Sequence, residues 1–203
     1  FKDVDGDGRI TRAADGQEVI GNSDPNVIFG WNNSLTYKGF GLNFLLQGSY
    51  GNEIFNAVRI KLESPATGTG ANLNNAWTPD NQNTNVPGFY YTSQELNLMQ
   101  LGASRTADAT GGADNRWSNY VEDGSYVRLK NITLSYNLPS SLLSKIKVPK
   151  LAVSVSGANL LTLTNYTGYD PEVSSFNLRS AGGDGIDLSN YPSSKTIMFG
   201  LNV

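Results

Sequence analysis

The sequence predicts an all-β protein in which antiparallel amphipathic strands form part of the wall of a large transmembrane β-barrel. Three observations support this fold class. Several runs alternate between apolar and polar side chains over about 11 residues, the length that a tilted strand needs to cross a bilayer. Charged residues make up only 16% of the chain, whereas aromatic residues reach 10% and glycine 22 of 203 positions. Short turns alternate with long polar loops, as they do at the two ends of an outer-membrane barrel.

Residues 27–37 and 40–50 predict a hairpin that turns at Lys38 and Gly39. In each run every second residue is apolar, and the residues between them are mostly glycine, amide or hydroxyl residues. Asn33 is the polar exception among the apolar positions of the first run. A hairpin that covers a soluble core would show the same alternation. The strand length and the aromatic residues near the ends favour the membrane. The apolar residues are Val27, Phe29, Trp31, Leu35 and Tyr37 in the first run, and Phe40, Leu42, Phe44, Leu46 and Tyr50 in the second.

Three more strands are predicted at residues 125–138, 149–163 and 195–203. In the first of these, the apolar residues stand at odd positions up to Leu129 and at even positions from Ile132 onward. A β-bulge near Lys130 and Asn131 would restore one continuous apolar face.

The connections are unequal in length. Residues 139–148 predict a short turn, whereas 64–120 and 165–194 predict long loops, with a short helix at 93–101 in the first of them. Residues 53–63 predict a strand or a strand extension. Five strands cannot close a barrel, and lipid does not tolerate open sheet edges. We therefore expect the chain to be one portion of a longer protein.

An acidic segment at the start of the chain predicts a calcium site. Carboxylates stand at alternate positions from residue 3 to residue 7 and Gly8 follows, which is how an EF-hand loop begins. The bidentate acid expected at the twelfth loop position is replaced by Ala14, although the next residue is acidic. A solvated acidic turn is the other interpretation. The candidate ligands are Asp3, Asp5, Asp7 and Asp15.

Composition excludes several kinds of chemistry. The chain has no histidine and no cysteine, so it cannot build a Ser-His-Asp or Cys-His centre or an ordinary zinc site. The net charge of −3 and the lack of a basic stripe argue against nucleic-acid binding. Two carboxylate pairs, Glu122–Asp123 and Asp170/Glu172, could suggest a glycosidase. Their turn-like contexts favour turn and lumen-rim roles, so no enzymatic activity is expected.

A series of short motifs resembles the C-terminal part of SusC/RagA-type TonB-dependent outer-membrane transporters. Each motif is weak alone, but together they follow the order and spacing of the family across almost the whole chain. They are residues 3–10, 19–22, 37–40, 47–52, 77–79, 120–125, 127–132, 134–136, 157–160, 168–172, 191–192 and 200–202.

The resemblance implies a 22-stranded barrel in the cell outer membrane with an N-terminal plug. Such transporters import glycan oligomers or peptides with energy relayed by TonB, and a SusD-like surface lipoprotein covers them as a lid. Residues 1–203 would then form a C-terminal portion of the barrel, with an acidic Ca²⁺-type loop at 1–24, long loops at 64–120 and 165–194, and no plug domain. The resemblance places the possible structural Ca²⁺ on the extracellular side, at the positions of Asp3, Asp5 and Asp7. The implied partners are the SusD-like lipoprotein, TonB through the missing plug region, an oligosaccharide or peptide substrate, and outer-membrane lipid.

Some residue roles stay open from sequence. Arg128 and Lys130, beside Tyr126, could line a polar lumen or cap the strand at headgroup level, and the structural role is favoured. Loop aromatic residues could stack on sugar rings or pack against the lipoprotein. These aromatic residues are Trp77, Tyr90, Tyr91 and Trp117.

Two other classes of protein compete with the transporter. A secreted soluble β-sandwich carbohydrate-binding module with a calcium loop would fold in water without detergent. A carboxylate glycoside hydrolase would depend on Glu122 or Glu172. The long loop at 64–120 and the lipid-length strands count against both.

Overall fold

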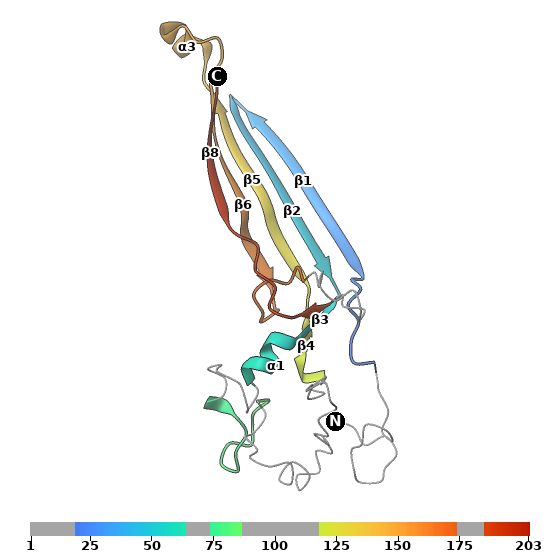
Figure 1. The fold of residues 1–203 in the computed structure, drawn as a ribbon. Helices are drawn as coiled ribbons and strands as arrows, with labels where there is room; N and C mark the ends of the chain where they lie inside the picture. The colour runs from blue at the N-terminus through green and yellow to red at the C-terminus, as the bar shows by residue number, and fades with distance from the viewer. Residues whose placement is uncertain (1–18, 64–73, 87–117, 174–184) are drawn as a thin grey trace.

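The computed structural model describes residues 19–63, 74–86, 118–173 and 185–203. Its main feature is a five-stranded antiparallel sheet in the order β1-β2-β5-β6-β8, which we call the wall (Figure 1). All five predicted strands are confirmed, with bounds that differ by up to three residues. They are β1 (Val27–Tyr37), β2 (Phe40–Tyr50), β5 (Tyr126–Asn137), β6 (Ala152–Thr164) and β8 (Thr196–Asn202).

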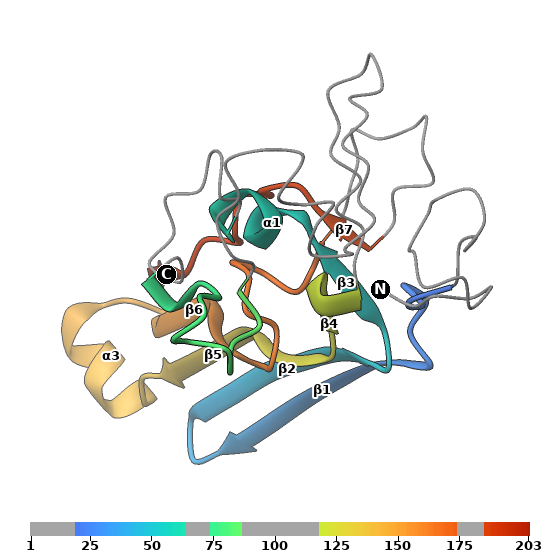
Figure 2. The same ribbon diagram turned by 90° about the horizontal axis from the view of Figure 1, so that it is seen from below.

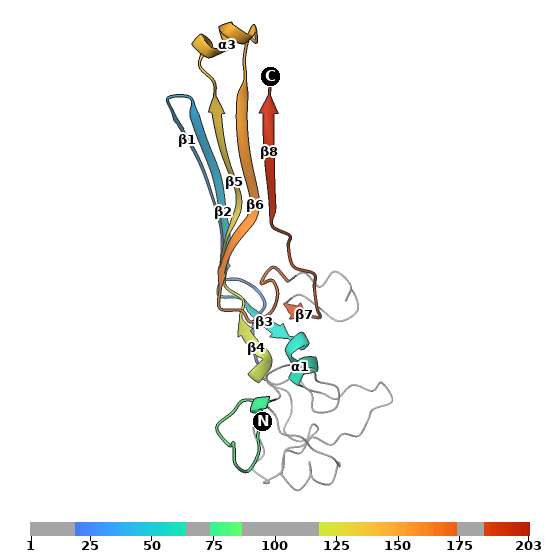
Figure 3. The ribbon, with the colours of Figure 1, turned by 90° about the vertical axis from the view of Figure 1, so that its left-hand side faces the viewer.

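The connections at one end of the wall are short, as predicted. Lys38 and Gly39 both have positive φ, 45° and 87°, as a two-residue type I′ hairpin requires. The turn between β5 and β6 contains the helix α3 (Ser140–Ile146), which ends at Lys147 in the left-handed region. Figure 3 shows α3 and the C-terminus at one end of the wall and the remaining small elements at the other.

The pairing register makes one face of the wall apolar, with Asn33, opposite Phe44, as its polar exception. Trp31 pairs with Leu46, Leu42 with Leu134, and the same face continues through β6 into β8. Many of these side chains are well exposed: Trp31 is 55% and Phe199 87% exposed. The face comprises Val27, Phe29, Trp31, Leu35, Tyr37, Phe40, Leu42, Phe44, Leu46, Tyr50, Val127, Leu129, Ile132, Leu134, Tyr136, Val153, Val155, Leu161, Leu163, Ile197, Phe199 and Leu201.

The predicted bulge in β5 is confirmed. Leu45 and Leu46 of β2 pair with Asn131 and Leu129, so Lys130 is one extra residue in β5. Strand β6 carries a further irregularity at the same level, where Asn159 has a positive φ of 53°. The bulge brings the alternating residues on both sides of it onto the same apolar face.

A small layer of elements, which we call the loop-end layer, lies at the other end of the wall. It contains a three-stranded sheet in the order β4-β3-β7 and the helix α1. Figure 2 shows this layer on the concave side of the curved wall. Most of the buried apolar side chains belong to this end, among them Ile54 and Tyr120. The bounds are β3 (Glu53–Asn56), α1 (Ala57–Glu63), β4 (Val121–Asp123) and β7 (Ile186–Asp187), with a 3-10 turn at Ser118–Tyr120.

The loop-end layer corrects three predictions. Residues 53–63 are a strand only up to Asn56, because the amide of Asn56 accepts a hydrogen bond from the Arg59 backbone N–H at 2.9 Å and caps a helix there. The loop at 165–194 contains the strand β7, and Glu122 belongs to the strand β4 rather than to a turn. Asp123 ends β4, and its carboxylate accepts a hydrogen bond from the Ser125 backbone N–H at 2.9 Å, as the predicted turn requires. The predicted helix at 93–101 lies outside the described residues.

In the described part of the chain, no helix combines the length and the hydropathy needed to cross a membrane.

Candidate functional site

The concave face of the wall is mostly polar, and Ile28, Leu45 and Met198 are apolar exceptions. Gly41, Asn43 and Gln47 of β2 lie opposite Ser135, Thr133 and Arg128 of β5, and all of them have the parity opposite to the apolar face. The hydroxyls of Thr133 and Ser156 are hydrogen bonded across β5 and β6 at 3.0 Å. Small uncharged polar side chains therefore cover the middle of this face.

A charged cluster, which we call the Arg128 cluster, lies on this face near the loop-end layer. It consists of Arg128, Lys130, Asp170 and Glu172. The Arg128 guanidinium is buried and donates to Asp170 Oδ1 at 2.5 Å, to Glu172 Oε2 and, through Nε, to Thr162 Oγ1 at 2.9 Å. Lys130 reaches the same Glu172 carboxylate at 3.0 Å.

The Arg128 cluster joins both arms of the connection between β6 and β8. The outgoing arm supplies Asp170 and Glu172, and the returning arm supplies Ser193, whose hydroxyl accepts from Arg128 Nη1 at 3.2 Å. The Asp170 carboxylate also accepts from the backbone N–H groups of Glu172 and Ser193, both at 2.9 Å. This arrangement fixes the two arms to the concave face.

The bulge decides that Arg128 faces this side. If β5 kept all its residues but alternated regularly without the bulge, Arg128 would lie on the same face as Ile132 and Leu134 and would project from the apolar face. With it, Arg128 lies beside Gln47 and Thr162 on the polar face. These contacts support a structural role for Arg128, although as an anchor of the β6–β8 connection on the polar face and not as the predicted cap at headgroup level.

A second charged cluster, the Arg59 cluster, lies in the loop-end layer. Arg59 and Glu63, one turn apart on α1, form an ion pair of 2.9 Å, and Arg59 Nη1 reaches Glu122 of β4 at 3.0 Å. Glu122 also accepts from the backbone N–H and the hydroxyl of Thr167, at 2.9 and 2.7 Å, and from the Asn56 amide at 3.2 Å. Glu122 thus connects α1 with β4 and the connection after β6.

Two of the four carboxylates that bond these arginines, Glu122 and Asp170, have pKa values below their ordinary ones. Burial by itself would raise the pKa of Glu122, but the hydrogen bonds from Thr167, Arg59 and Asn56 outweigh it, so the pKa lies below its usual value. Burial also opposes ionisation of Asp170, and there Arg128 and the two backbone N–H groups lower the pKa. Burial would lower the pKa of Arg59, but its hydrogen bonds and ion pairs with Glu122 and Glu63 outweigh that effect, so the pKa is raised.

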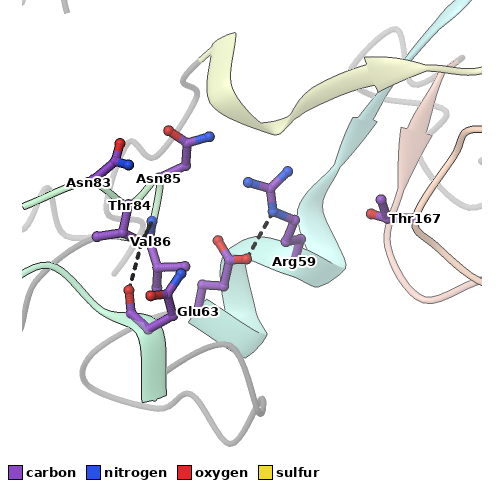
Figure 4. A pocket seen from close by; sticks show the side chains of 8 residues that line it. Arg59, Glu63, Asn83, Thr84, Asn85, Val86 and Thr167 are labelled. Carbon is purple, nitrogen blue, oxygen red and sulfur yellow. Dashed lines mark hydrogen bonds and ion pairs between the residues drawn. The ribbon is translucent and has the colours of Figure 1, made fainter. Parts of the chain in front are cut away.

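An open polar hollow lies between α1 and residues 74–86, with a volume of about 460 Å³. Figure 4 shows Asn83 and Asn85 on one side of the hollow, Arg59 and Glu63 on the other, and Thr167 beyond Arg59. Residues 74–86 hold their own shape, because Thr84 and Asn81 donate to the backbone carbonyl of Asn75 at 2.6 and 3.3 Å.

The other predicted site residues have mixed outcomes. Asp3, Asp5, Asp7 and Asp15 lie outside the described residues, and among the residues that are described no three acidic, histidine or cysteine side chains converge as a metal site would require. Tyr90, Tyr91 and Trp117 also lie outside that part, and Trp77 is half-buried.

The sequence prediction did not include the hollow. Arg59 and Glu63 are four residues apart, a helical spacing that could have indicated an ion pair. Their partner Glu122 is 63 positions away from Arg59, and no local pattern reveals such a contact.

No family model matches the sequence. Curated relatives match it along its full length: the chain is 40% identical to TonB-dependent receptor P3 and 33% identical to TonB-dependent receptor P26, both of Formosa agariphila. It is 25% identical over 98% of its length to TonB-dependent receptor SusC of Bacteroides thetaiotaomicron.

Solved structures agree with these relatives. The fold matches the RagAB peptide transporter with a TM-score of 0.66 and 26% identity, and the RagAB peptide importer in the closed-closed state with 0.64 and 27%. Each match covers 90% of this chain and 18% of the solved chain.

The chain spans less than a fifth of each of these proteins: 18% of P3, 19% of P26 and 17% of SusC. These relatives are receptors and transporters by name, and the match runs along the whole of the present sequence. The resemblance predicted from the motifs is confirmed, and the chain is a barrel segment of the SusC/RagA-type TonB-dependent receptor family.

Proposed function

We propose that this chain forms part of the wall of an outer-membrane barrel that imports solutes with energy relayed by TonB. One observation carries the proposal: the register gives five neighbouring strands one face that is apolar apart from Asn33 and one face that is mostly polar. An apolar band that faces lipid and a polar face that lines a hydrated lumen are the two surfaces of a transmembrane barrel.

The finer features of the proposal follow from the relatives. A solved structure similar to this chain is described as the RagAB peptide importer, and one curated relative is the TonB-dependent receptor SusC. On this basis we propose that the cargo is glycan oligomers or peptides, that a SusD-like lipoprotein covers the extracellular end, and that TonB acts through a plug region outside these 203 residues. The loop-end layer would face the lipoprotein, and α3 would lie on the periplasmic side.

A structural Ca²⁺ in the acidic loop is also part of the proposal. Its support is the spacing of Asp3, Asp5, Asp7 and Asp15, whose mutual repulsion a cation would relieve. The pair of changes Asp5→Asn and Asp7→Asn is expected to abolish any EDTA-dependent fall in the melting temperature of the full-length receptor. A melting curve of the unchanged protein that is the same with and without EDTA would contradict the site.

The soluble β-sandwich fits less well. Such a protein would cover its apolar face with a second sheet. In the described ranges no sheet or helix covers the apolar face of the wall, and Phe40, Leu163 and Phe199 all remain more than half exposed.

The test is a comparison of neighbouring positions on opposite faces. Cysteine would be introduced singly at Asn43 and at Phe44 in the full-length receptor, in an otherwise cysteine-free background, within intact outer membranes. A water-soluble maleimide is expected to label the Asn43→Cys variant, and to label the Phe44→Cys variant only after detergent is added. Ser135→Cys and Leu134→Cys form an independent pair on β5.

Equal labelling of both members in both pairs would overturn the proposal, because a barrel wall has one wet face and one lipid face. Protection of the polar members together with labelling of the apolar members would overturn it equally.

A further inference from the structure

We propose that the hollow between α1 and residues 74–86 binds an uncharged, acceptor-rich portion of the imported solute and disfavours anionic solutes. This inference rests on the proposed transport function and adds the chemical class of the cargo at one defined place. It is carried by unused hydrogen-bond donors and by the charge of the groups around them.

The donors come from both sides of the hollow. Arg59 uses Nε and Nη1 on Glu63 and Glu122, while its Nη2 has no partner among the described residues. The amides of Asn83 and Asn85, both exposed, likewise make no side-chain hydrogen bond within the described part of the chain. Three groups with N–H donors thus border one open space (Figure 4).

The guanidinium is held ready for a ligand. Two carboxylates hold it in place, and it lies over the ring of Tyr120 at 5.2 Å from the ring centre. A donor that is already fixed loses little conformational freedom when it binds an acceptor. The side chain is still 22% exposed, so a solute can reach it.

The charge of the site opposes anions. Among the residues that the structure describes here, Arg59 contributes one positive charge and Glu63 and Glu122 contribute two negative charges, a net charge of −1 for these three side chains. A sulfate or carboxylate on a solute would meet this negative charge when it approached the guanidinium. Carbonyl, hydroxyl and ether oxygens accept the same hydrogen bonds without that repulsion.

The lining also indicates how the solute is held. The described lining residues contain no aromatic ring, so hydrogen bonds rather than ring stacking would fix the ligand. A volume of about 460 Å³ lies within the range of small-ligand sites, which suits a short stretch of a longer cargo. Sugar hydroxyls and peptide carbonyls share this chemistry, and the experiment separates the two sources.

The experiment measures which compounds the purified full-length receptor with its lipoprotein retains from defined pools, by mass spectrometry. One pool holds neutral maltodextrins and their sulfated counterparts. A second pool holds capped hexapeptides without charged side chains and their glutamate-containing counterparts. The unchanged complex is expected to retain uncharged members of one pool, and that pool identifies the source.

Three variants test the hollow itself. The double change Asn83→Ala and Asn85→Ala is expected to lower retention about tenfold, as the loss of two hydrogen bonds should. The matched control Asn74→Ala removes an exposed amide of the same segment that does not line the hollow, and it should change nothing. Glu122→Gln neutralises one acidic group and is expected to increase retention of the sulfated or glutamate-containing members.

The inference would be overturned by preferential retention of anionic members, by equal effects of the double variant and the control, or by retention of neither uncharged set. If cysteine labelling of the wall alternates as expected and retention does not depend on Asn83 and Asn85, only this inference fails. If the labelling does not alternate, the transport function fails first.

Discussion

Two arginines of this chain stand in similar acidic surroundings but differ in how completely they are bonded. Arg128 uses Nε, Nη1 and Nη2 on four partners, and its side chain is 3% exposed. Arg59 uses Nε and Nη1 on two partners, and its side chain is 22% exposed. Both face carboxylates, so charge alone does not distinguish their roles.

The number of unused donors separates a structural cation from one that is available to a ligand. A guanidinium that is saturated by its own chain stabilises the fold and has little capacity left for a solute. A guanidinium with an unused nitrogen beside an open space keeps donors that water or a ligand must satisfy. Arg128 is the first kind, and Arg59 is the second.

The largest effect is expected for Arg128→Ala. It leaves Asp170 and Glu172 near the wall without their main cation, and breaking a buried pair in this way costs roughly 3–5 kcal/mol. Amide hydrogen exchange of the full-length receptor should show a loss of protection in residues 166–173 and 188–195. The surface change Lys150→Ala is the control. Unchanged exchange in both arms would show that Arg128 does not anchor them.

A smaller effect is expected for Arg59→Ala. Glu122 keeps its bonds from Thr167 and Asn56, and the guanidinium whose ion pairs are lost is 22% exposed rather than 3%. We expect a loss of about 2 kcal/mol in the protection of α1 and β4, the size of one charge-assisted hydrogen bond. A loss as large as that of Arg128→Ala would remove the distinction between the two clusters.

Acid should weaken both clusters in the same direction. Glu122 and Asp170 have native pKa values below the ordinary 4.5 and 3.8, so the unfolded chain takes up protons first as the pH falls. Their stabilisation is complete above these ordinary values and is lost as the pH falls through the lowered native pKa. A pH series of hydrogen exchange in α1, β4 and the two arms measures this loss, and Glu122→Gln should remove the part that belongs to the Arg59 cluster. Stability that rises on acidification would contradict the assignment.

The smallest effect is expected for Lys130→Ala. Lys130 is 31% exposed, and Glu172 retains Arg128 and the Tyr126 hydroxyl, the latter at 3.0 Å. An exposed ion pair of this kind contributes about 0.5 kcal/mol. Exchange in residues 166–173 should barely change, and a loss near that of Arg128→Ala would mean that the lysine is the true anchor.

The wall was predictable from sequence because each strand is long enough to show a period of two. The change of parity between Leu129 and Ile132 even indicated the bulge. The strands β3, β4 and β7 have four, three and two residues, too few for any period to appear. These short strands form because the loop-end layer buries the Ile54 side chain. Burial of that kind depends on tertiary packing, which a local sequence pattern does not show.

The charged clusters were predictable only in part. Arg128, Lys130, Asp170 and Glu172 were all identified as candidates, but as separate features of a strand and a loop. Arg128 is 42 positions from Asp170, and sequence spacing does not reveal a contact of that separation. One side of the hollow is lined by residues 74–86, whose polar sequence shows neither a helical nor a strand period of apolar residues.

The bulge at Lys130 lets β5 hold one residue more than β2 while both faces of the wall continue across that level. Deleting Lys130 alone would place Leu129 next to Asn131, which already face opposite sides, so β5 would become regular and every other side chain would keep its side. Deleting a residue elsewhere in β5 while the bulge is kept would instead exchange the two faces on one side of the cut. In related receptors, a strand that is one residue shorter at this level should therefore be regular and keep the same polar and apolar faces.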